Sequence, residues 1–168
     1  KIVAECLARH YAREHRIAVI VVRPFNHVGP GQSTRFVIAD FAGQIMQRVS
    51  ISRQGKHLSP LRVGNVDVKR DLLDVRDVAR AYRLALRHGR SGEVYNIASG
   101  RHHSIREVVH RMMNIAGISV PLVEEARRMR KQDIVLMCGD ATKFKRLTGW
   151  KPEISLQQTL QDVLIHAG

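Results

Sequence analysis

The chain has 168 residues, 44% hydrophobic and 26% charged, which is the composition of an ordinary globular domain. Its formal net charge of +13 favours an anionic partner: a nucleic acid, a membrane surface or a phosphorylated small molecule. Aromatic residues are only 5% of the chain, and no run of basic and aromatic residues is present to stack bases. This argues against a nucleic-acid partner, although the charge alone leaves the partner open. No apolar run approaches the roughly 20 residues of a membrane helix, so we expect no membrane partner.

The two cysteines, Cys6 and Cys138, lie far apart and do not form a CxxC pair. This usage argues against a disulfide scaffold or a zinc ribbon and fits a reducing cytoplasm. The chain begins at Lys1, without Met and within a helical pattern, and it carries no leader-like segment. We therefore interpret it as a piece of a longer cytoplasmic protein.

In chain order, the first expected elements are a helix, a strand and a second helix. Apolar residues at helical spacing predict a helix over residues 2–15. The β-branched run Ile17–Val22 predicts a strand buried on both faces of a parallel sheet. Prolines and glycines between positions 24 and 31 enforce a loop, and a helical pattern resumes near Arg35. This alternation indicates an α/β fold with some parallel pairing.

The rest of the chain continues the alternation. Short apolar runs predict strands over residues 61–63, 68–73, 93–98 and 134–137. Polar residues suited to cap the amino ends of four helices are Asp74, Ser104, Asp140 and Ser155. Glycines placed to end the first three of these helices are Gly89, Gly117 and Gly149.

The most informative segment is Arg23–Gln32, which reads Arg-Pro-Phe-Asn-His-Val-Gly-Pro-Gly-Gln. It follows a strand and precedes a helix, the place where open α/β sheets bind ligands. A helix amino terminus there offers free N–H groups to phosphate. The segment is not the dinucleotide fingerprint, because Pro30 separates its glycines and Thr34 replaces the third glycine. From its residues alone, it is equally well a turn that binds nothing.

The pattern Arg-Pro-x-Asn-x-x-Gly-Pro-Gly after such a strand resembles the extended short-chain dehydrogenase/reductase family, also known as the NAD-dependent epimerase/dehydratase family. Its form in this chain is similar to the subgroup of GDP-6-deoxy-D-mannose reductases. Later blocks at 63–78, 130–133 and 139–152 agree with that family in order and spacing. The resemblance therefore runs from the first residue to the last helix.

The resemblance implies a fold and a division of the chain. We expect the C-terminal part of a Rossmann-type doubly wound sheet together with the small α/β substrate-binding lobe. Residues 1–31 and 67–98 would form late strands and helices of the Rossmann domain. Residues 32–66 and 99–168 would form the lobe that binds a nucleotide sugar.

The resemblance also implies the substrate-binding residues. Asn26 would contact the diphosphate of a GDP-sugar, and Arg70 and Arg130 would clamp its oxygens, since guanidinium groups bind phosphate bidentately. Asn65 and Lys69 would lie beside the nucleotide. The family usually has proline where this chain has Lys131, which suggests a less rigid loop after Arg130. The alternative for Arg70 is a salt bridge to Asp71 or Asp74.

The cofactor implied by the resemblance is NAD(P)H, with NADPH and NADH both open. Lys1 would be the catalytic lysine of a Tyr-x-x-x-Lys pair, lowering the pKa of the tyrosine and holding the nicotinamide ribose. Pro24 and Phe25 would line the nicotinamide pocket. The alternative for Lys1 is a solvated helix residue. The tyrosine and the Gly-rich loop are not in this sequence, so we expect the chain alone to be inactive.

The implied function is part of a reductase of the C4 ketone of GDP-4-dehydro-6-deoxy-D-mannose, giving GDP-D-rhamnose. One alternative is a GDP-mannose 4,6-dehydratase or another nucleotide-sugar epimerase/dehydratase. An alternative from another class is a non-enzymatic basic module that binds nucleic acid or a protein partner. Dimers are common in the resembling family, which makes a homodimer of the full-length protein one expectation.

A metal site is the last alternative. The aspartates Asp71, Asp74 and Asp77 recur every third position, and His102 and His103 are adjacent. A helix cap explains Asp74 and Asp77 without an ion, and the histidines lack further ligands at suitable spacing. We expect no metal.

Overall fold

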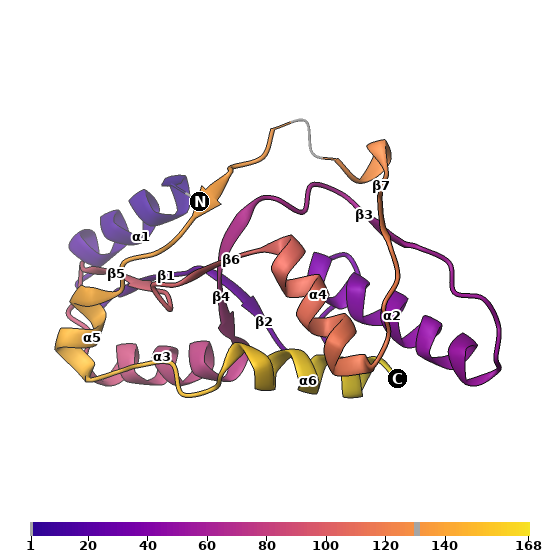
Figure 1. Cartoon of the computed structure of the whole chain (residues 1–168). Helices are drawn as coiled ribbons and strands as arrows, with labels where there is room; N and C mark the ends of the chain where they lie inside the picture. Colours follow the sequence, from indigo (N-terminus) through magenta and orange to yellow (C-terminus); the bar gives the residue numbers. More distant parts are fainter. Residues whose placement is uncertain (1, 130–131) are drawn as a thin grey trace.

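The computed structural model describes residues 2–129 and 132–168, and it shows short strands covered by helices (Figure 1). The helices are α1 (Ile2–Glu14), α2 (Val37–Arg53), α3 (Val75–His88), α4 (Ile105–Ala116), α5 (Thr142–Thr148) and α6 (Leu156–Ala167), with a 3-10 turn η1 (Ala126–Arg128). The strands are β1 (Val21–Pro24), β2 (Asn26–Val28), β3 (Leu61–Val63), β4 (Lys69–Asp74), β5 (Val94–Ile97), β6 (His102–Ser104), β7 (Leu122–Glu124) and β8 (Leu136–Met137).

Strand β4 is the centre of the largest sheet. It pairs in parallel with β2 and β8 and antiparallel with β6. Two further parallel pairs, β1 with β5 and β3 with β7, form separate small sheets. The predicted α/β fold with parallel pairing is confirmed. Strand β4 thereby joins segments that are far apart in sequence, including those around residues 27 and 136.

The predicted strand over Ile17–Val22 differs from the observed one, because strand β1 covers Val21–Pro24. Strand β1 begins only at Val21, and Ile17 is 52% exposed. The prediction of burial on both faces is wrong for the described chain, because β1 has β5 as its one described neighbour and its apolar residues are only half buried. A β-branched run indicates a strand, but burial depends on which elements pack against it.

Two hydrophobic cores lie on either side of the centre of the molecule. Helices α2, α4 and α6 pack together over the first core, which includes the fully buried Phe41, Ile45 and Met112. Helices α3 and α5 cover the second core with β5, and Tyr95, Phe144 and Trp150 form its aromatic centre. Figure 1 shows the first group of helices on one side of β4 and the second group on the other.

The predicted amino-terminal caps are local features, and three of the four are confirmed. The fourth is wrong by one residue, because the cap position of α5 is Ala141 and not Asp140. Asp74, Ser104 and Ser155 each accept a backbone N–H from the first turn of the helix that follows. Asp140 accepts the N–H of Thr142 at 2.7 Å, so its carboxylate also satisfies a donor of the first turn. These bonds fix where the covering helices begin.

Two of the three predicted helix-ending glycines adopt the left-handed conformation. Gly117 and Gly149 both have a φ of 69°. Gly89 also ends its helix, as predicted, but with a φ of −66°, so it does not adopt the left-handed conformation that is common for a glycine at a helix end. A Cβ on Gly89 would lie 2.5 Å from the carbonyl oxygen of Ala85, so a close approach, and not a positive φ, requires glycine there.

Asp74 ties helix α3 to helix α6, and it makes stability depend on pH. Its side chain has no exposed area and accepts hydrogen bonds from Arg76 and, at 2.8 Å, from the hydroxyl of Thr159. Burial alone would raise the pKa of Asp74, but the bonds from Arg76 and Thr159 outweigh it and hold this pKa below its ordinary value. The carboxylate therefore stabilises the fold above the unfolded-state pKa, and this stability is lost as pH falls through the folded-state pKa.

We expect Asp74→Asn to reduce the loss of unfolding free energy between about pH 5 and pH 3. Urea unfolding at several pH values measures this change. Asp67→Asn is the matched control, since that carboxylate pairs with Arg106 but is 71% exposed and screened by water. Equal effects of the two substitutions would show that the shielding of the Asp74 hydrogen bonds from water does not cause the pH dependence of stability.

Candidate functional site

A cavity of about 350 Å³ opens beside β4. Its wall comes from β2, the start of α2, the loop after β3, β4 itself and the segment before β8. The residues that line it are Asn26, Thr34, Arg35, Phe36, Val37, Asp40, Phe41, Gly64, Asn65, Val66, Val68, Arg70, Leu72, Ile105, Arg128 and Asp133. The structure thus brings Asn26, Asn65 and Arg70 to one cavity; that they bind substrate stays a prediction.

Arg70 is only 9% exposed, and its guanidinium is held firmly. One nitrogen, Nη1, donates to the carbonyl oxygens of Ile134 at 2.6 Å and Lys69 at 2.9 Å. The other, Nη2, donates to Oδ1 of Asp133 at 2.5 Å. The described residues accept three of the five N–H groups of this side chain, which leaves donors for an anionic ligand.

The ion-pair partner of Arg70 differs from the one considered from sequence. A bond to Asp71 or Asp74 is wrong, because the carboxylate that contacts Arg70 belongs to Asp133. Successive side chains on a strand point to opposite faces, so Arg70 faces the cavity while Asp71 faces away from it. A buried arginine with a fixed carboxylate is oriented before any ligand arrives, which lowers the entropy cost of binding.

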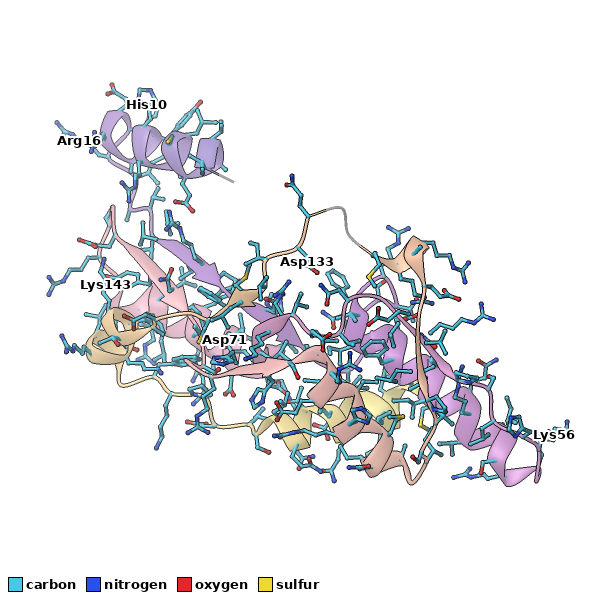
Figure 2. All side chains as sticks on the ribbon, turned by 45° about the horizontal axis from the view of Figure 1, so that its top comes forward. His10, Arg16, Lys56, Asp71, Asp133 and Lys143 are labelled. Carbon is cyan, nitrogen blue, oxygen red and sulfur yellow. The ribbon has the colours of Figure 1, made fainter. Side chains whose placement is uncertain are left out.

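The segment that carries Asp133 lies along β4. Strand β8 pairs with it in parallel, with Leu136 opposite Lys69, and the N–H of Lys69 donates to the carbonyl of Val135 at 2.8 Å. Figure 2 shows Asp133 at this central part of the molecule. The predicted ligand Arg130 lies outside the described residues, as does Lys131.

Asp71 anchors this segment from the other face of β4. It is completely buried and accepts bonds from the N–H and the hydroxyl of Ser99 at 3.0 and 2.6 Å, and from the N–H groups of Gly100 and Gly139 at 2.9 and 3.2 Å. The thiol of Cys138 adds a longer contact, with Sγ 3.9 Å from Oδ2. One carboxylate thereby joins β4, the turn after β5 and the chain just after β8. Of the labelled side chains in Figure 2, Asp71 and Asp133 lie in the centre of the molecule.

A second arginine of the cavity wall is also paired with a carboxylate. Nη1 of Arg128 donates to Oδ2 of Asp40 at 2.7 Å, and its Nε lies 3.3 Å from Oε2 of Glu125. Arg35 also lines the cavity and is exposed. Sequence reasoning missed these three cavity residues, Arg35, Asp40 and Arg128. The dense basic run at 127–131 was the signal for Arg128.

The cavity is suited to a nucleotide-like anion. Among the residues that the structure describes, its wall holds three arginines against two aspartates, an excess of one positive charge. Arginine forks bind phosphate oxygens, and the amides of Asn26 and Asn65 add donors and acceptors. Phe36, 57% exposed at the entrance to α2, offers a flat apolar face.

The remaining predicted residues lie elsewhere. Lys69 is exposed and is not among the residues that line the cavity. Pro24 ends β1, and Phe25 packs against the second core, where its N–H donates to the carbonyl of Ile97 at 2.9 Å. Lys1 lies outside the described residues.

The described residues assigned to the cofactor do not form a dinucleotide site by themselves. Pro24 has no N–H group, and the N–H of Phe25 is already bonded within the fold. The carbonyl of Phe25 lies 3.1 Å from Nδ1 of His27. These two residues can therefore contribute at most one wall of such a pocket.

The part of the chain that the structure describes contains neither a cluster of metal ligands nor a membrane-spanning helix. Within residues 2–129 and 132–168, no three His, Cys, Asp or Glu side chains come together as a metal site would require. In the same part of the chain, no helix has the length and apolar character needed to cross a membrane.

Gly64 lies in the cavity wall, close to the backbone of Arg128. A Cβ at this position would lie 2.5 Å from the carbonyl oxygen of Arg128, so the loop carrying Arg128 would have to move. We expect Gly64→Ala to destabilise the chain by about 1–3 kcal/mol. Gly43→Ala is the control: Gly43 lies inside α2 with no atom within 4 Å of a new Cβ, and alanine there should stabilise by about 0.5–1 kcal/mol. Urea unfolding compares the two, and equal stabilities would contradict the close contact.

Comparison with known proteins places this cavity in a family context. The model of the family described as GDP-mannose 4,6 dehydratase matches residues 1–163. The GDP-6-deoxy-D-mannose reductase of Pseudomonas aeruginosa is 41% identical over 164 residues, which are 98% of this chain and 53% of that protein.

Solved structures agree. The structure of RMD from Pseudomonas aeruginosa complexed with NADPH superposes with a TM-score of 0.89 at 40% identity, covering 99% of this chain and 54% of that chain. A UDP-glucose 4-epimerase from Thermotoga maritima, solved with UDP-glucose, gives a TM-score of 0.84 at 28% identity and covers 99% and 51%. The chain therefore spans about half the length of the relatives it matches.

Proposed function

This chain belongs to the GDP-mannose 4,6-dehydratase family, and from this premise we propose that it forms the sugar-nucleotide-binding part of a reductase. The reaction is reduction of the C4 ketone of GDP-4-dehydro-6-deoxy-D-mannose to give GDP-D-rhamnose. The observation that carries the proposal is the cavity beside β4, where Asn26, Asn65 and the pre-oriented Arg70 meet. The 41% identity to a GDP-6-deoxy-D-mannose reductase supports the choice of substrate.

The fold expected from the resemblance is confirmed by the solved relatives, since the α/β chain matches the C-terminal part of epimerase/dehydratase structures. The division into lobes is part of the proposal. Residues 1–31 and 67–98 belong to the Rossmann domain, and residues 32–66 and 99–168 to the substrate lobe. The two hydrophobic cores support two lobes, although Phe144 and Trp150 pack with the Rossmann-side core.

In this proposal, Arg70 binds the diphosphate through the N–H groups that the described residues leave free, while Asp133 keeps its guanidinium in place. Asn26, on β2, and Asn65, in the loop after β3, orient the nucleotide. Arg130 is a second clamp and Lys69 a neighbour of the nucleotide. Binding energy from the nucleotide, far from the reacting ketone, positions the sugar.

NAD(P)H supplies the hydride when bound, and Lys1 assists the proton donor. The relative solved with NADPH supports this cofactor class. Pro24 and Phe25 form one wall of the nicotinamide pocket. The proposed setting is the cytoplasm, with a homodimer as the proposed assembly of the full-length protein.

Two other functions are outcomes of the test. A dehydratase would act on GDP-mannose itself and is favoured by the name of the matching family. A basic binding module without activity is favoured by the net charge of +13.

The test uses the full-length protein that contains this chain. It is incubated with GDP-4-dehydro-6-deoxy-D-mannose and either NADPH or NADH. Oxidation of the cofactor is measured as the loss of absorbance of its reduced form, and the sugar-nucleotide product is identified separately. Cofactor oxidation with formation of GDP-D-rhamnose supports the reductase. Turnover of GDP-mannose with oxidised cofactor would support the dehydratase instead, and no turnover of either would favour the binding module.

A further inference from the structure

A second and larger cavity, of about 720 Å³, opens on another part of the molecule. It lies between the carboxyl end of β4, the turn that joins β5 to β6, helices α4 and α5, and the linker that precedes α6. Within residues 2–129 and 132–168, Leu72 is the only one that lines both cavities. A sugar nucleotide in the first cavity would therefore leave this second cavity, called the basic cleft below, open.

Positive side chains come to this cleft from three separate segments. Arg101 lies on the β5–β6 turn, Lys145 on α5 and Lys151 on the linker before α6. The ion pairs of the described residues include a carboxylate partner for none of these three. Lys145 has only a weak bond from Nζ to the carbonyl of Ser99, at 3.4 Å. Arg111 also lines the cleft, but its Nη2 lies 2.5 Å from a Glu107 carboxylate.

The carboxylates that line the cleft are already used by other arginines. Asp74 has no exposed side-chain area and pairs with Arg76 at 2.7 Å. Glu153 pairs with Arg80 of α3. Neither of the two forms an ion pair with Arg101, Lys145 or Lys151 among the described residues. The described lining of the cleft thus contains four basic side chains and two carboxylates, and both carboxylates are paired with arginines outside the cleft lining.

We propose that this basic cleft binds a phosphorylated anion, at a site separate from the cavity beside β4. Like charges that share one concave surface repel each other, and an anion that enters between them removes this cost. A guanidinium and two ammonium groups suit a phosphate or diphosphate, because the fork of Arg101 can bind two oxygens while the lysines act as point charges. This site does not depend on the proposed reductase function.

The experiment is a titration of the chain with inorganic pyrophosphate at low salt. Calorimetry measures the affinity, and NMR chemical shifts of the backbone amides locate the site. The titration is run with the Arg70→Ala variant as well as the unchanged chain, so that binding beside β4 is separated from binding in the cleft. The expected result is pyrophosphate binding in both proteins, with amide shifts at Ser99–Arg101 and at Lys145 and Lys151.

The triple variant Arg101→Ala/Lys145→Ala/Lys151→Ala should weaken this binding by roughly tenfold or more. The control is Arg83→Ala/Arg87→Ala/Arg90→Ala, which removes the same charge from exposed residues of α3 and the turn after it. Equal weakening by both triple variants would mean that net charge alone attracts the ion, and the proposal would fail. Amide shifts confined to residues around Asn65 and Arg70 would also overturn it.

Discussion

Arg70→Ala is expected to lower the affinity for GDP-mannose by about 10- to 150-fold, since charge-assisted hydrogen bonds contribute about 1.5–3 kcal/mol. Arg70 is the most buried arginine of the cavity wall, and its orientation is fixed by Asp133 and two carbonyl groups before ligand binds. Removing it also leaves the Asp133 carboxylate without its partner. Isothermal titration of the chain with GDP-mannose measures the loss.

Two further variants serve as controls for the Arg70→Ala result. Arg70→Lys keeps the charge but loses the fork, so it should recover only part of the affinity. Arg62→Ala removes an arginine that pairs with Glu125, is 60% exposed and does not line the cavity, so it should bind GDP-mannose normally. If Arg70→Ala binds as tightly as Arg62→Ala, the cavity beside β4 is not the nucleotide site.

The second large effect is expected for Asp71→Asn. In Asp71 the oxygen Oδ1 accepts from Ser99, and the oxygen Oδ2 accepts from the N–H groups of Gly100 and Gly139. The amide of asparagine has one oxygen, so its NH₂ group must face one of these two sets of donors and leave it without an acceptor. The unfolding free energy should fall by about 3 kcal/mol. Because Asp71 also anchors the end of the segment that carries Asp133, GDP-mannose affinity should fall by roughly tenfold as that segment loosens.

Asp77→Asn is the matched control for Asp71→Asn. Asp77 is 2% exposed and accepts N–H groups from Glu153 and Ile154, both at 3.0 Å, together with a bond from Arg80. It holds the linker before α6 and does not line the cavity beside β4. Both variants should be less stable, but only Asp71→Asn should bind GDP-mannose more weakly. Equal affinities in urea-free buffer would make Asp71 a stabilising residue without a role in the site.

Features encoded within one turn of helix could be predicted from sequence. Ser104 and Ser155 cap helices because the side-chain oxygen and the N–H it accepts are three residues apart. The same local reasoning predicts the helix end at Gly89, but the requirement for glycine there comes from the neighbouring carbonyl of Ala85 and from the side chain of Ile20. The contact with Ile20 is a tertiary one that no helix-end pattern contains.

The candidate site was predictable only in part, for the same reason. The resemblance indicated Asn26, Asn65 and Arg70, and these residues do meet at one cavity. The carboxylate that orients Arg70 lies 63 positions further along the chain and reaches it only because β8 pairs with β4. The bond from Arg128 to Asp40 spans 88 positions. Spacing in sequence carries no information about such pairs.

The central claim is that this chain recognises a GDP-sugar through the cavity beside β4. The most direct measurement is isothermal titration of the chain with GDP-mannose, with UDP-glucose and a DNA duplex as comparison ligands at two salt concentrations. We predict binding of GDP-mannose, clearly weaker binding of UDP-glucose and no specific binding of the duplex. Equal affinity for both nucleotide sugars, or duplex binding that falls steeply with salt while GDP-mannose does not bind, would contradict the account.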